Sequence, residues 1–386
     1  MVTDKKIDIF VPGRLCLFGE HSDWASGYRT LDPSIAVGHC LTAGTNQGIV
    51  ALAFRHPDTL IIMSSGMVGS NIIFRCPMNE LLLENAKQNG FFCYCAGVAY
   101  YIQRKFKVCG LVIENITNIP IKKGLASSAA ICVLVARAFN QIYNLGLTIA
   151  EEMEIAYQGE ILTGSQCGRM DQVCAYGEVP VFLTFDGDDM QVEQLFPQSP
   201  LYFVIVDLKV GKDTKRILAD LNHHFITGGS FCGRHAPASS LDRADDHNGS
   251  RELRDGLRYA LGDGNAQILF EAKKAILSGD AETVGVLMCE AQTMFDRLVA
   301  PACPTELAAP KLHQVLAYPP IQELIWGGKG VGSQGDGSAQ FVARGFIEQQ
   351  EIVKRLEKLD VTCLTLTVGK NKANTNIFFG KRGDEQ

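Results

Sequence analysis

Long hydrophobic runs are missing from this sequence. No stretch of eighteen consecutive apolar residues occurs in the 386-residue chain, so it predicts no membrane-spanning helix and no membrane partner. An excess of basic residues is missing as well, since 36 Lys and Arg stand against 42 Asp and Glu. Nucleic-acid-binding domains usually carry a basic face, and the formal net charge of -6 therefore argues against a nucleic-acid partner.

The 13 cysteines lack the regular spacing of a disulfide framework. Cys93 and Cys95 are too close together for a zinc knuckle, and Cys167, Cys174 and Cys303 have no CxxC companion. The beginning of the chain shows no signal-peptide pattern. We therefore expect buried free thiols in a reducing compartment, with the cytoplasm as the default location.

Two common phosphate-binding fingerprints are also missing, because GxxxxGK[ST] is absent and no GxGxxG follows a strand in residues 120–140. This segment, PIKKGLASSAAICVLVARAFN, nevertheless joins a glycine-containing turn to an apolar, helix-forming run. Free N–H groups and the helix dipole favour an anion there, and a nucleotide phosphate is the natural guest. The alternative is an ordinary strand-to-helix connection in which Ser127 and Ser128 only cap the helix.

At 386 residues the chain is too long for one ordinary core. We expect one domain at residues 1–190 and another at 200–386, with residues 191–200 crossing between them. Hydrophobic periodicity and turn residues predict strands at 7–10, 14–19, 45–54, 60–63, 109–115, 179–185, 201–206, 339–343, 361–367 and 375–379. They predict helices at 79–88, 91–106, 149–162, 209–221, 266–277, 282–299, 311–316 and 347–359, besides the helix that follows Ser127.

The predicted helix at 149–162 carries a carboxylate on its apolar face. Thr148 and Glu151 form a capping box at its start, and Glu160 falls on the same stripe as apolar residues. A buried carboxylate needs a partner, which makes Glu160 a candidate functional acid. The alternative is that Glu160, near the helix end, turns into solvent. A second carboxylate, Asp171, follows in the turn CGRMDQ.

Three other stretches have unusual composition. Glu20-His21-Ser22-Asp23-Trp24 places three ionisable groups between a strand end and a turn, a common position for binding residues. Six glycines within residues 327–337 allow close backbone approach, either to a ligand or to another chain segment. Residues 222–265 are poorly patterned and predict a mobile region or a lid, after a locally basic helix start at Lys212, Lys215 and Arg216.

The stretches PGRLCLFGEHSDW, IPIKKGLASSAA and GVGSQGDGSAQF occur in this order between residues 11 and 345. Together they resemble the three motifs of the GHMP kinases, the superfamily of galactokinase, homoserine kinase, mevalonate kinase and phosphomevalonate kinase. GEHSDWASG and CGRMDQ are most similar to galactokinase motifs, whereas mevalonate kinases share GEH without the following Asp. The resemblance implies a two-lobed α+β fold, with an N-terminal lobe like ribosomal protein S5 domain 2 and a ferredoxin-like C-terminal lobe.

The resemblance also implies roles for matched residues. Asp171 would orient the acceptor hydroxyl or accept its proton, with Arg14 beside it. Ser128, or Ser127 in its place, would hold Mg2+ together with Glu160. The ATP phosphates would be wrapped by Lys123, Gly124, Leu125, Ala126, Ser127, Ser128 and Ala129. Substrate hydroxyls would be bound by Glu20, His21 and Asp23.

The implied activity is ATP- and Mg2+-dependent phosphorylation of a free sugar or close derivative, at the anomeric hydroxyl by family analogy. The alternatives are a kinase for another small alcohol such as mevalonate, which Asp23 disfavours, and a sensor that binds sugar and ATP without turnover. Arg169 departs from the galactokinase pattern, where an apolar residue is usual. Its side chain either reaches an acidic substrate or folds back onto a nearby carboxylate. The oligomeric state is not indicated.

Overall fold

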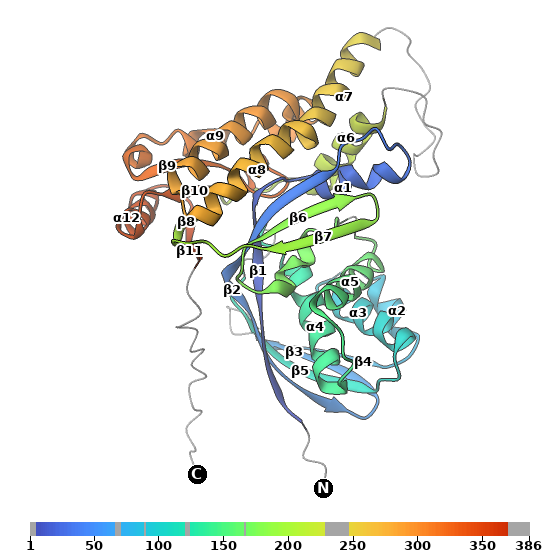
Figure 1. Cartoon of the computed structure of the whole chain (residues 1–386). Helices are drawn as coiled ribbons and strands as arrows, with labels where there is room; N and C mark the ends of the chain where they lie inside the picture. Colours follow the sequence, from blue (N-terminus) through green and yellow to red (C-terminus); the bar gives the residue numbers. More distant parts are fainter. Residues whose placement is uncertain are drawn as a thin grey trace.

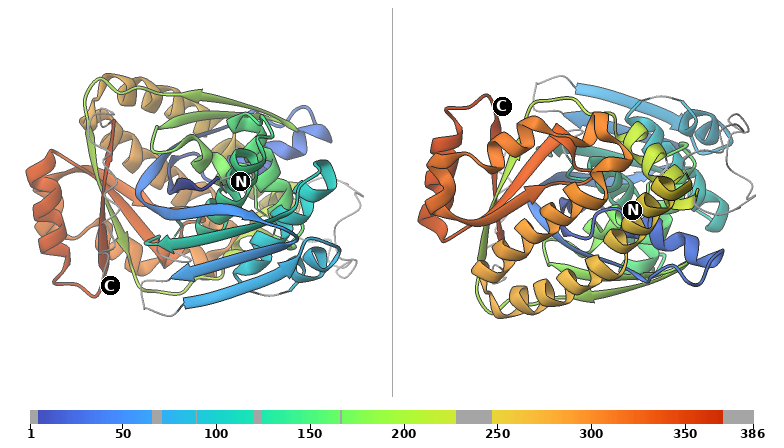
Figure 2. Two further views of the ribbon diagram at one scale, coloured as in Figure 1. Left: turned by 90° about the horizontal axis from the view of Figure 1, so that it is seen from below. Right: turned by 90° about the horizontal axis from the view of Figure 1, so that it is seen from above.

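Two β-sheets, one of seven strands and one of four, organise the protein (Figure 1). The computed structural model describes residues 5–65, 71–88, 90–119, 124–165, 167–227 and 247–369. Helices cover one face of the larger sheet, and the C-terminal helices and the smaller sheet gather at one end of the molecule (Figure 2).

The larger sheet contains β1 (Ile7–Phe18), β2 (Gly38–His56), β3 (Thr59–Ser65), β4 (Asn71–Pro77), β5 (Gly110–Thr117), β6 (Val181–Asp186) and β7 (Asp189–Gln194). The smaller sheet contains β8 (Leu201–Asp207), β9 (Ile325–Gly330), β10 (Ser338–Ala343) and β11 (Thr362–Val368). The helices are α1 (Ser22–Gly27), α2 (Leu81–Ala86), α3 (Phe92–Lys105), α4 (Ser127–Tyr143), α5 (Ile149–Ile161), α6 (Thr214–Ile226), α7 (His247–Leu261), α8 (Asp263–Ser278), α9 (Ala281–Leu298), α10 (Pro304–Leu307), α11 (Pro310–Leu316) and α12 (Phe346–Leu356).

The long strand β2 is central to the larger sheet, whose order is β4-β3-β5-β2-β6-β7, with β1 also paired to β2. Its pairings with β1, β5 and β6 are antiparallel, and β3 runs parallel to β5. We predicted two strands around Pro12 and Gly13. The structure instead has one strand, in which the register slips between Pro12 and Arg14. Proline lacks the N–H that a ladder needs, and here the ladder shifts rather than ends.

Helices α3, α4 and α5 form a layer against the larger sheet (Figure 1). The apolar run of α4 is buried from Ala129 to Ala136, which explains the absence of polar residues there. The predicted capping box at α5 is confirmed, because the N–H of Glu151 donates to Thr148 Oγ1 and the N–H of Thr148 donates to Glu151 Oε2. α4 and α5 therefore bring their ends to defined positions beside β1.

The smaller sheet has the order β11-β8-β10-β9. Helix α9 lies very close to β9, since a β-carbon on Gly327 would be 2.0 Å from the backbone oxygen of Gly285. The largest apolar cluster includes Val331, Val342 and Leu366 together with residues of β1 and α4. The division into domains at 1–190 and 200–386 stays a prediction.

The structure changes the bounds of two predicted connections. The expected crossing at residues 191–200 overlaps β7, which forms a hairpin with β6 through the pair Asp186 and Asp189, and residues 195–200 lead from β7 to β8 of the smaller sheet. Within the poorly patterned stretch 222–265, residues 247–261 form helix α7, whose Leu257 and Leu261 are buried while most neighbours are polar. Residues 228–246 and the predicted strand at 375–379 lie outside the described residues.

In the part of the chain that the structure describes, no helix combines the length and the apolar character needed to cross a membrane. The cysteines described there are free thiols, as predicted. Most are at least partly buried, but Cys109 and Cys289 are exposed, contrary to the expectation of burial.

Candidate functional site

The start of α4 presents backbone N–H groups rather than a side-chain cap. Ala126 is the N-cap residue, with φ 52° and ψ 47°, and no side chain makes a cap hydrogen bond. We expected the serines at the N-cap, but Ser127 and Ser128 are the first two helical residues. The first intrahelical bond runs from Ala130 N to Ala126 O, at 3.0 Å. The N–H groups before it have no acceptor within the helix and can bind an anion.

The loop before α4 is held against β1. Arg14 N donates to Leu125 O at 3.0 Å, and a β-carbon on Gly13 would lie 2.9 Å from the same oxygen. Gly124 has φ +77°, a conformation that glycine adopts without strain. Lys123, which we expected to contact phosphate, lies outside the described residues. We call residues 124–129 the phosphate loop.

Glu160, at the end of α5, is buried with 1% of its surface exposed, so the alternative in which it turns into solvent was wrong. Gln172 Nε2 donates to Glu160 Oε2 at 2.8 Å. Burial, followed by the charge of Asp171, raises the pKa of Glu160 to about 7, although hydrogen bonds from Ser128 and Gln172 lower it. A buried carboxylate with hydroxyl and amide neighbours, but no cation among these influences, is suited to a metal ion.

Arg14 of β1 and Asp171, the first residue of a 3₁₀ turn at Asp171–Tyr176, form an ion pair. The Arg14 side chain is 5% exposed and that of Asp171 is 27% exposed, so the carboxylate keeps an open side. Nε and Nη1 of Arg14 are buried and have no hydrogen-bond partner in the described part of the chain. Unpaired buried donors are costly, which makes these two nitrogens candidates for a further hydrogen bond.

Asp23 of α1 lies against the CGRMDQ turn. A β-carbon on Gly168 would be only 1.8 Å from Asp23 Oδ2, so only glycine leaves room for this carboxylate. The Met170 N–H faces the same oxygen at 3.5 Å. Burial, followed by the charge of Asp171, raises the pKa of Asp23 to about 6. Two sequence motifs that lie far apart thus meet at adjacent carboxylates.

His21 adopts a left-handed conformation, with φ 71°, immediately before α1. Trp24 Nε1 donates to His21 Nδ1 at 3.0 Å, which leaves the proton of the neutral ring on Nε2. Burial, followed by the positive charge of Lys212, lowers the pKa of His21 to about 4. Its buried Nε2 makes no hydrogen bond of good geometry to the described residues. His21 is therefore a neutral hydrogen-bond donor.

Glu20 has a different partner from the one predicted. Its carboxylate forms a buried ion pair with Lys329, whose side chain is 1% exposed. Lys329 Nζ also donates to Gly330 O at 3.0 Å. Glu20 thus joins the first motif to the glycine-rich stretch, and its role in binding substrate hydroxyls stays a prediction. Lys329 was missed, although it is the one lysine within the glycine run.

Lys212 was noted only as part of a basic helix start, but it contacts the glycine-rich stretch. Its Nζ donates to Gln334 O at 2.6 Å, and Val331 O lies at 3.5 Å. The stretch also packs on the phosphate loop, because a β-carbon on Gly124 would lie 3.3 Å from Val331 Cγ1. Of the two explanations for the glycines, close approach to another chain segment is observed.

Arg169 folds back onto its own surroundings. It donates to the backbone oxygen of Asp188, lies 3.5 Å from Glu154 Oε1 and stacks over the Tyr157 ring at 5.0 Å. These contacts match the alternative in which Arg169 holds its loop. We therefore do not carry it forward as a substrate-binding residue.

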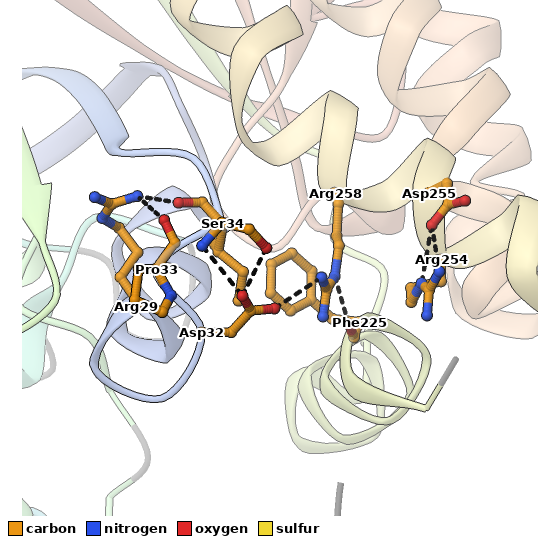
Figure 3. Close-up of polar contacts among 9 residues, drawn as sticks. Arg29, Asp32, Pro33, Ser34, Phe225, Arg254, Asp255 and Arg258 are labelled. Carbon is orange, nitrogen blue, oxygen red and sulfur yellow. Dashed lines mark hydrogen bonds and ion pairs between the residues drawn. The ribbon is translucent and has the colours of Figure 1, made fainter. Parts of the chain in front are cut away.

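Helix α1 is held by the C-terminal helices as well as by β2. Ser22 Oγ donates to Leu261 O, and Asn265 Nδ2 donates to Ser22 Oγ, both at 2.8 Å. Farther along, Arg258 of α7 reaches Asp32 at 3.2 Å and donates to the backbone oxygen of Phe225 (Figure 3). These bonds fix the helix that carries Asp23.

The comparisons with known proteins agree with the motifs. A family model described as the GHMP kinases N terminal domain matches residues 93–178. The galactokinase of Pasteurella multocida is 24% identical over 371 residues, which cover 91% of this chain and 88% of that protein. The galactokinase of Glaesserella parasuis serovar 5 is 23% identical over 303 residues, or 73% and 72% of the two chains.

The chain belongs to the GHMP kinase superfamily. The structure of Lactococcus lactis galactokinase complexed with galactose matches this GHMP kinase with a TM-score of 0.70 and 18% identity, over 96% of this chain and 95% of that one. L. major mevalonate kinase in complex with R-mevalonate matches with a TM-score of 0.65 and 16% identity, over 94% and 97%. The predicted α+β GHMP kinase fold is confirmed.

The side chains present suit Mg2+. Ser128 and Glu160 supply a hydroxyl and a carboxylate, the oxygen ligands that Mg2+ prefers. No group of three or more His, Cys, Asp or Glu side chains placed to hold a metal occurs among the residues described for this GHMP kinase. A pair of protein ligands is nevertheless sufficient, because Mg2+ usually keeps waters and binds substrate phosphates as well.

Proposed function

We propose that this GHMP kinase transfers the γ-phosphoryl group of ATP to a hydroxyl of a free sugar or close derivative, at the anomeric position, giving a sugar 1-phosphate. The observation that carries the proposal is the meeting of Asp23 with the CGRMDQ turn, next to the ion pair of Asp171 and Arg14. Paired carboxylates can accept hydrogen bonds from several hydroxyls of one small polyol.

The phosphate loop supports ATP as the donor. Its backbone N–H groups at the start of α4 can bind phosphate oxygens, and the helix dipole adds to the attraction. The bond from Arg14 N to Leu125 O joins this loop to the strand that also positions Asp171. This link supports a rigid frame for donor and acceptor, which is the main requirement of phosphoryl transfer.

In the proposed reaction, the acceptor oxygen bonds to the γ-phosphorus while the bond to the bridging oxygen of ADP breaks. Asp171 orients the hydroxyl and takes its proton. The unpaired Nε and Nη1 of Arg14 donate to an oxygen of the transferred group or of the acceptor. Charge is neutralised by donors that are already in place, so little reorganisation is needed during the transfer.

Ser128 and Glu160 would hold Mg2+, which supplies neutralisation of phosphate charge when it is bound. The property of this chain that matters for metal binding is the burial of the Glu160 carboxylate. Burial raises the pKa of Glu160 to about 7, and a bound cation would lower this pKa again because its charge offsets the desolvation that opposes ionisation.

The deciding test is ADP release over a panel of aldoses, uronic acids, amino sugars and mevalonate, with Asp171→Asn as the control for contaminating kinases. We expect wild-type turnover on a neutral or acidic sugar and loss of that turnover in the variant. Turnover on mevalonate alone would replace the sugar assignment. Sugar and ATP binding without ADP release would identify a sensor instead of an enzyme.

A further inference from the structure

Lys212 is a partly buried cation whose charge is not neutralised by an ion pair within the described ranges of the chain. It lies between β8 and α6, and its Nζ contacts the backbone oxygens of Gln334 and Val331. Burial lowers the pKa of Lys212 to about 8, and Glu20 is the one group that raises it. That carboxylate is already paired with Lys329.

Two carbonyl oxygens satisfy hydrogen bonds of an ammonium group but do not balance its charge. Burying a lysine without a counter-charge is expensive, and buried charges in proteins are normally paired. Arg14 and Lys329 follow this rule, with Asp171 and Glu20 as their partners. Lys212, which is only partly buried, has no such partner among the described residues, so a ligand is the candidate source of a negative charge for it.

The surroundings of Lys212 place it between the two halves of the site. On one side is His21 of the GEHSDW segment. The positive charge of Lys212 lowers the pKa of His21. On the other side is the glycine-rich stretch, where a β-carbon on Gly337 would lie 2.9 Å from Lys212 Nζ. The same stretch reaches the phosphate loop, since a β-carbon on Gly332 would be 3.7 Å from Gly124 Cα.

We propose that Lys212 binds an anionic oxygen group of one of the two substrates, either the γ-phosphate of ATP or an acidic substituent of the acceptor. The inference rests on the proposed kinase function. It assigns to Lys212 the cation role for which the sequence had offered Arg169, whose guanidinium is committed to Glu154, Tyr157 and Asp188. A point-like ammonium suits a single phosphate or carboxylate oxygen.

The experiment compares wild type with Lys212→Met, which removes the charge and keeps an unbranched side chain. Lys209→Met is the matched control, because Lys209 lies three positions earlier, loses the same charge and forms an exposed pair with Asp360. Calorimetry with four probes measures affinity: the non-hydrolysable analogue AMP-PNP and ADP, each with Mg2+, and galactose and galacturonate. If the panel gives a better substrate, that sugar and its uronic acid replace the last two.

We expect a ten- to hundredfold loss of affinity, about the scale of one charge-assisted hydrogen bond, for one member of one pair of probes. Loss for AMP-PNP with ADP unchanged assigns Lys212 to the γ-phosphate. Loss for the uronic acid with the neutral sugar unchanged assigns it to the acceptor. Unchanged affinity for all four probes, or an equal loss for all four, would overturn the inference. Absence of nucleotide binding by wild type would instead refute the proposed function.

A second variant keeps the test decisive if Lys212→Met does not fold. Lys212→Gln retains a donor for the Gln334 oxygen while removing the charge, and thermal unfolding reports whether the fold is intact. With folded Lys212→Gln, the same selective loss is expected, because the loop contact is preserved and only the counter-charge for the ligand is missing. Wild-type affinities in that variant would likewise overturn the inference.

Discussion

Around the start of α4 the site consists of backbone groups, whereas around Asp171 it consists of charged side chains. The phosphate loop offers N–H groups and a helix dipole, which no substitution other than proline removes. The proposed acceptor side consists of Asp171, Arg14 and Asp23, each of which one substitution can neutralise. Single substitutions should therefore damage the acceptor side and the metal ligand far more than the phosphate loop.

The largest effect is expected for Asp171→Asn. Asparagine keeps the shape of the side chain but cannot take the hydroxyl proton, so kcat should fall by about 10²- to 10⁴-fold. Affinity for Mg2+ with AMP-PNP should change little, because the phosphate loop is intact. Steady-state ADP release and nucleotide titration check both statements. A kcat within about tenfold of wild type would remove Asp171 from its proposed role.

The next largest effect is expected for Glu160→Gln. The amide preserves the volume and can still face Gln172, but it offers the metal no charge. The Mg2+ concentration for half-maximal rate should rise about ten- to hundredfold, the range found even for outer-shell partners of metal sites. Thermal unfolding should show a folded protein. Near-normal turnover with an unchanged Mg2+ requirement would exclude Glu160 as a ligand.

The same carboxylate predicts a pH dependence. With its pKa raised to about 7, Glu160 is largely protonated at pH 6 and must lose the proton before it binds a metal. Mg2+ affinity of wild type should therefore increase as the pH rises from 6 to 8, and saturating Mg2+ should shift the apparent pKa downward because proton and metal compete. Glu160→Gln should abolish this shift. A pH-independent Mg2+ requirement in wild type would contradict the assignment.

Asp23→Asn should have an intermediate effect, confined to the acceptor. The variant keeps the contact with Gly168 but exchanges one acceptor oxygen for a donor, which weakens a paired hydrogen bond to substrate hydroxyls. We expect the KM for the sugar to rise about tenfold or more, the scale of one hydrogen bond to a charged group, with the KM for ATP unchanged. Equal changes in both constants would mean that Asp23 supports the fold instead.

These expectations depend on features that the sequence revealed unequally. Glu160 could be predicted because a carboxylate interrupts a helical stripe of apolar residues; Met153, Ala156 and Glu160 of that stripe are buried, whereas Ile149 at the helix start is exposed. The N-cap position of Ala126 could not be predicted, because serine is favoured at an N-cap. Only the bonds of the folded loop start the helix at Ser127, so that Ala126 becomes the N-cap. Local periodicity is sufficient to predict Glu160 as a buried carboxylate, but not to predict Ala126 as the N-cap.

Side chains that meet across the chain were the hardest to predict. Lys329 and Glu20 are separated by 309 positions, and no local pattern connects them. The contacts of Lys212 could not be predicted for the same reason, because the oxygens of Val331 and Gln334 lie far along the chain. Arg169 shows the opposite case, because its position near Asp171 suggested a substrate contact while Glu154 and Tyr157, brought close by α5, take up the guanidinium. Family motifs identified the carboxylates and Arg14, the partner of Asp171, but not Lys329, the partner of Glu20.

Arg169→Met should therefore have a small effect on stability and none on substrate choice. Loss of a partly exposed ion pair and a ring contact should lower the free energy of unfolding by about 0.5–1 kcal/mol. The specificity constants for a uronic acid and its neutral counterpart should fall by the same small factor. A selective loss for the uronic acid would return Arg169 to the substrate site.

The smallest effect is expected for Ala126→Gly on the phosphate loop. Glycine removes the strain of a β-carbon in the left-handed conformation but adds freedom to the unfolded chain, and the two contributions nearly cancel. The free energy of unfolding should change by less than about 1 kcal/mol. ATP affinity should stay within about threefold, because the N–H groups remain; a larger loss would show that the Ala126 side chain itself shapes the loop.

The anchoring of α1 has a consequence for engineering and for recombination between related enzymes. Ser22 is bonded to Leu261, 239 positions away, and to Asn265, 243 positions away. A graft of the GEHSDW segment into another kinase would leave these bonds behind, and Asp23 would lose its fixed position. A workable chimera has to move the segment together with α7 and the start of α8. The residues that position Asp23 are therefore encoded in two separate parts of the gene.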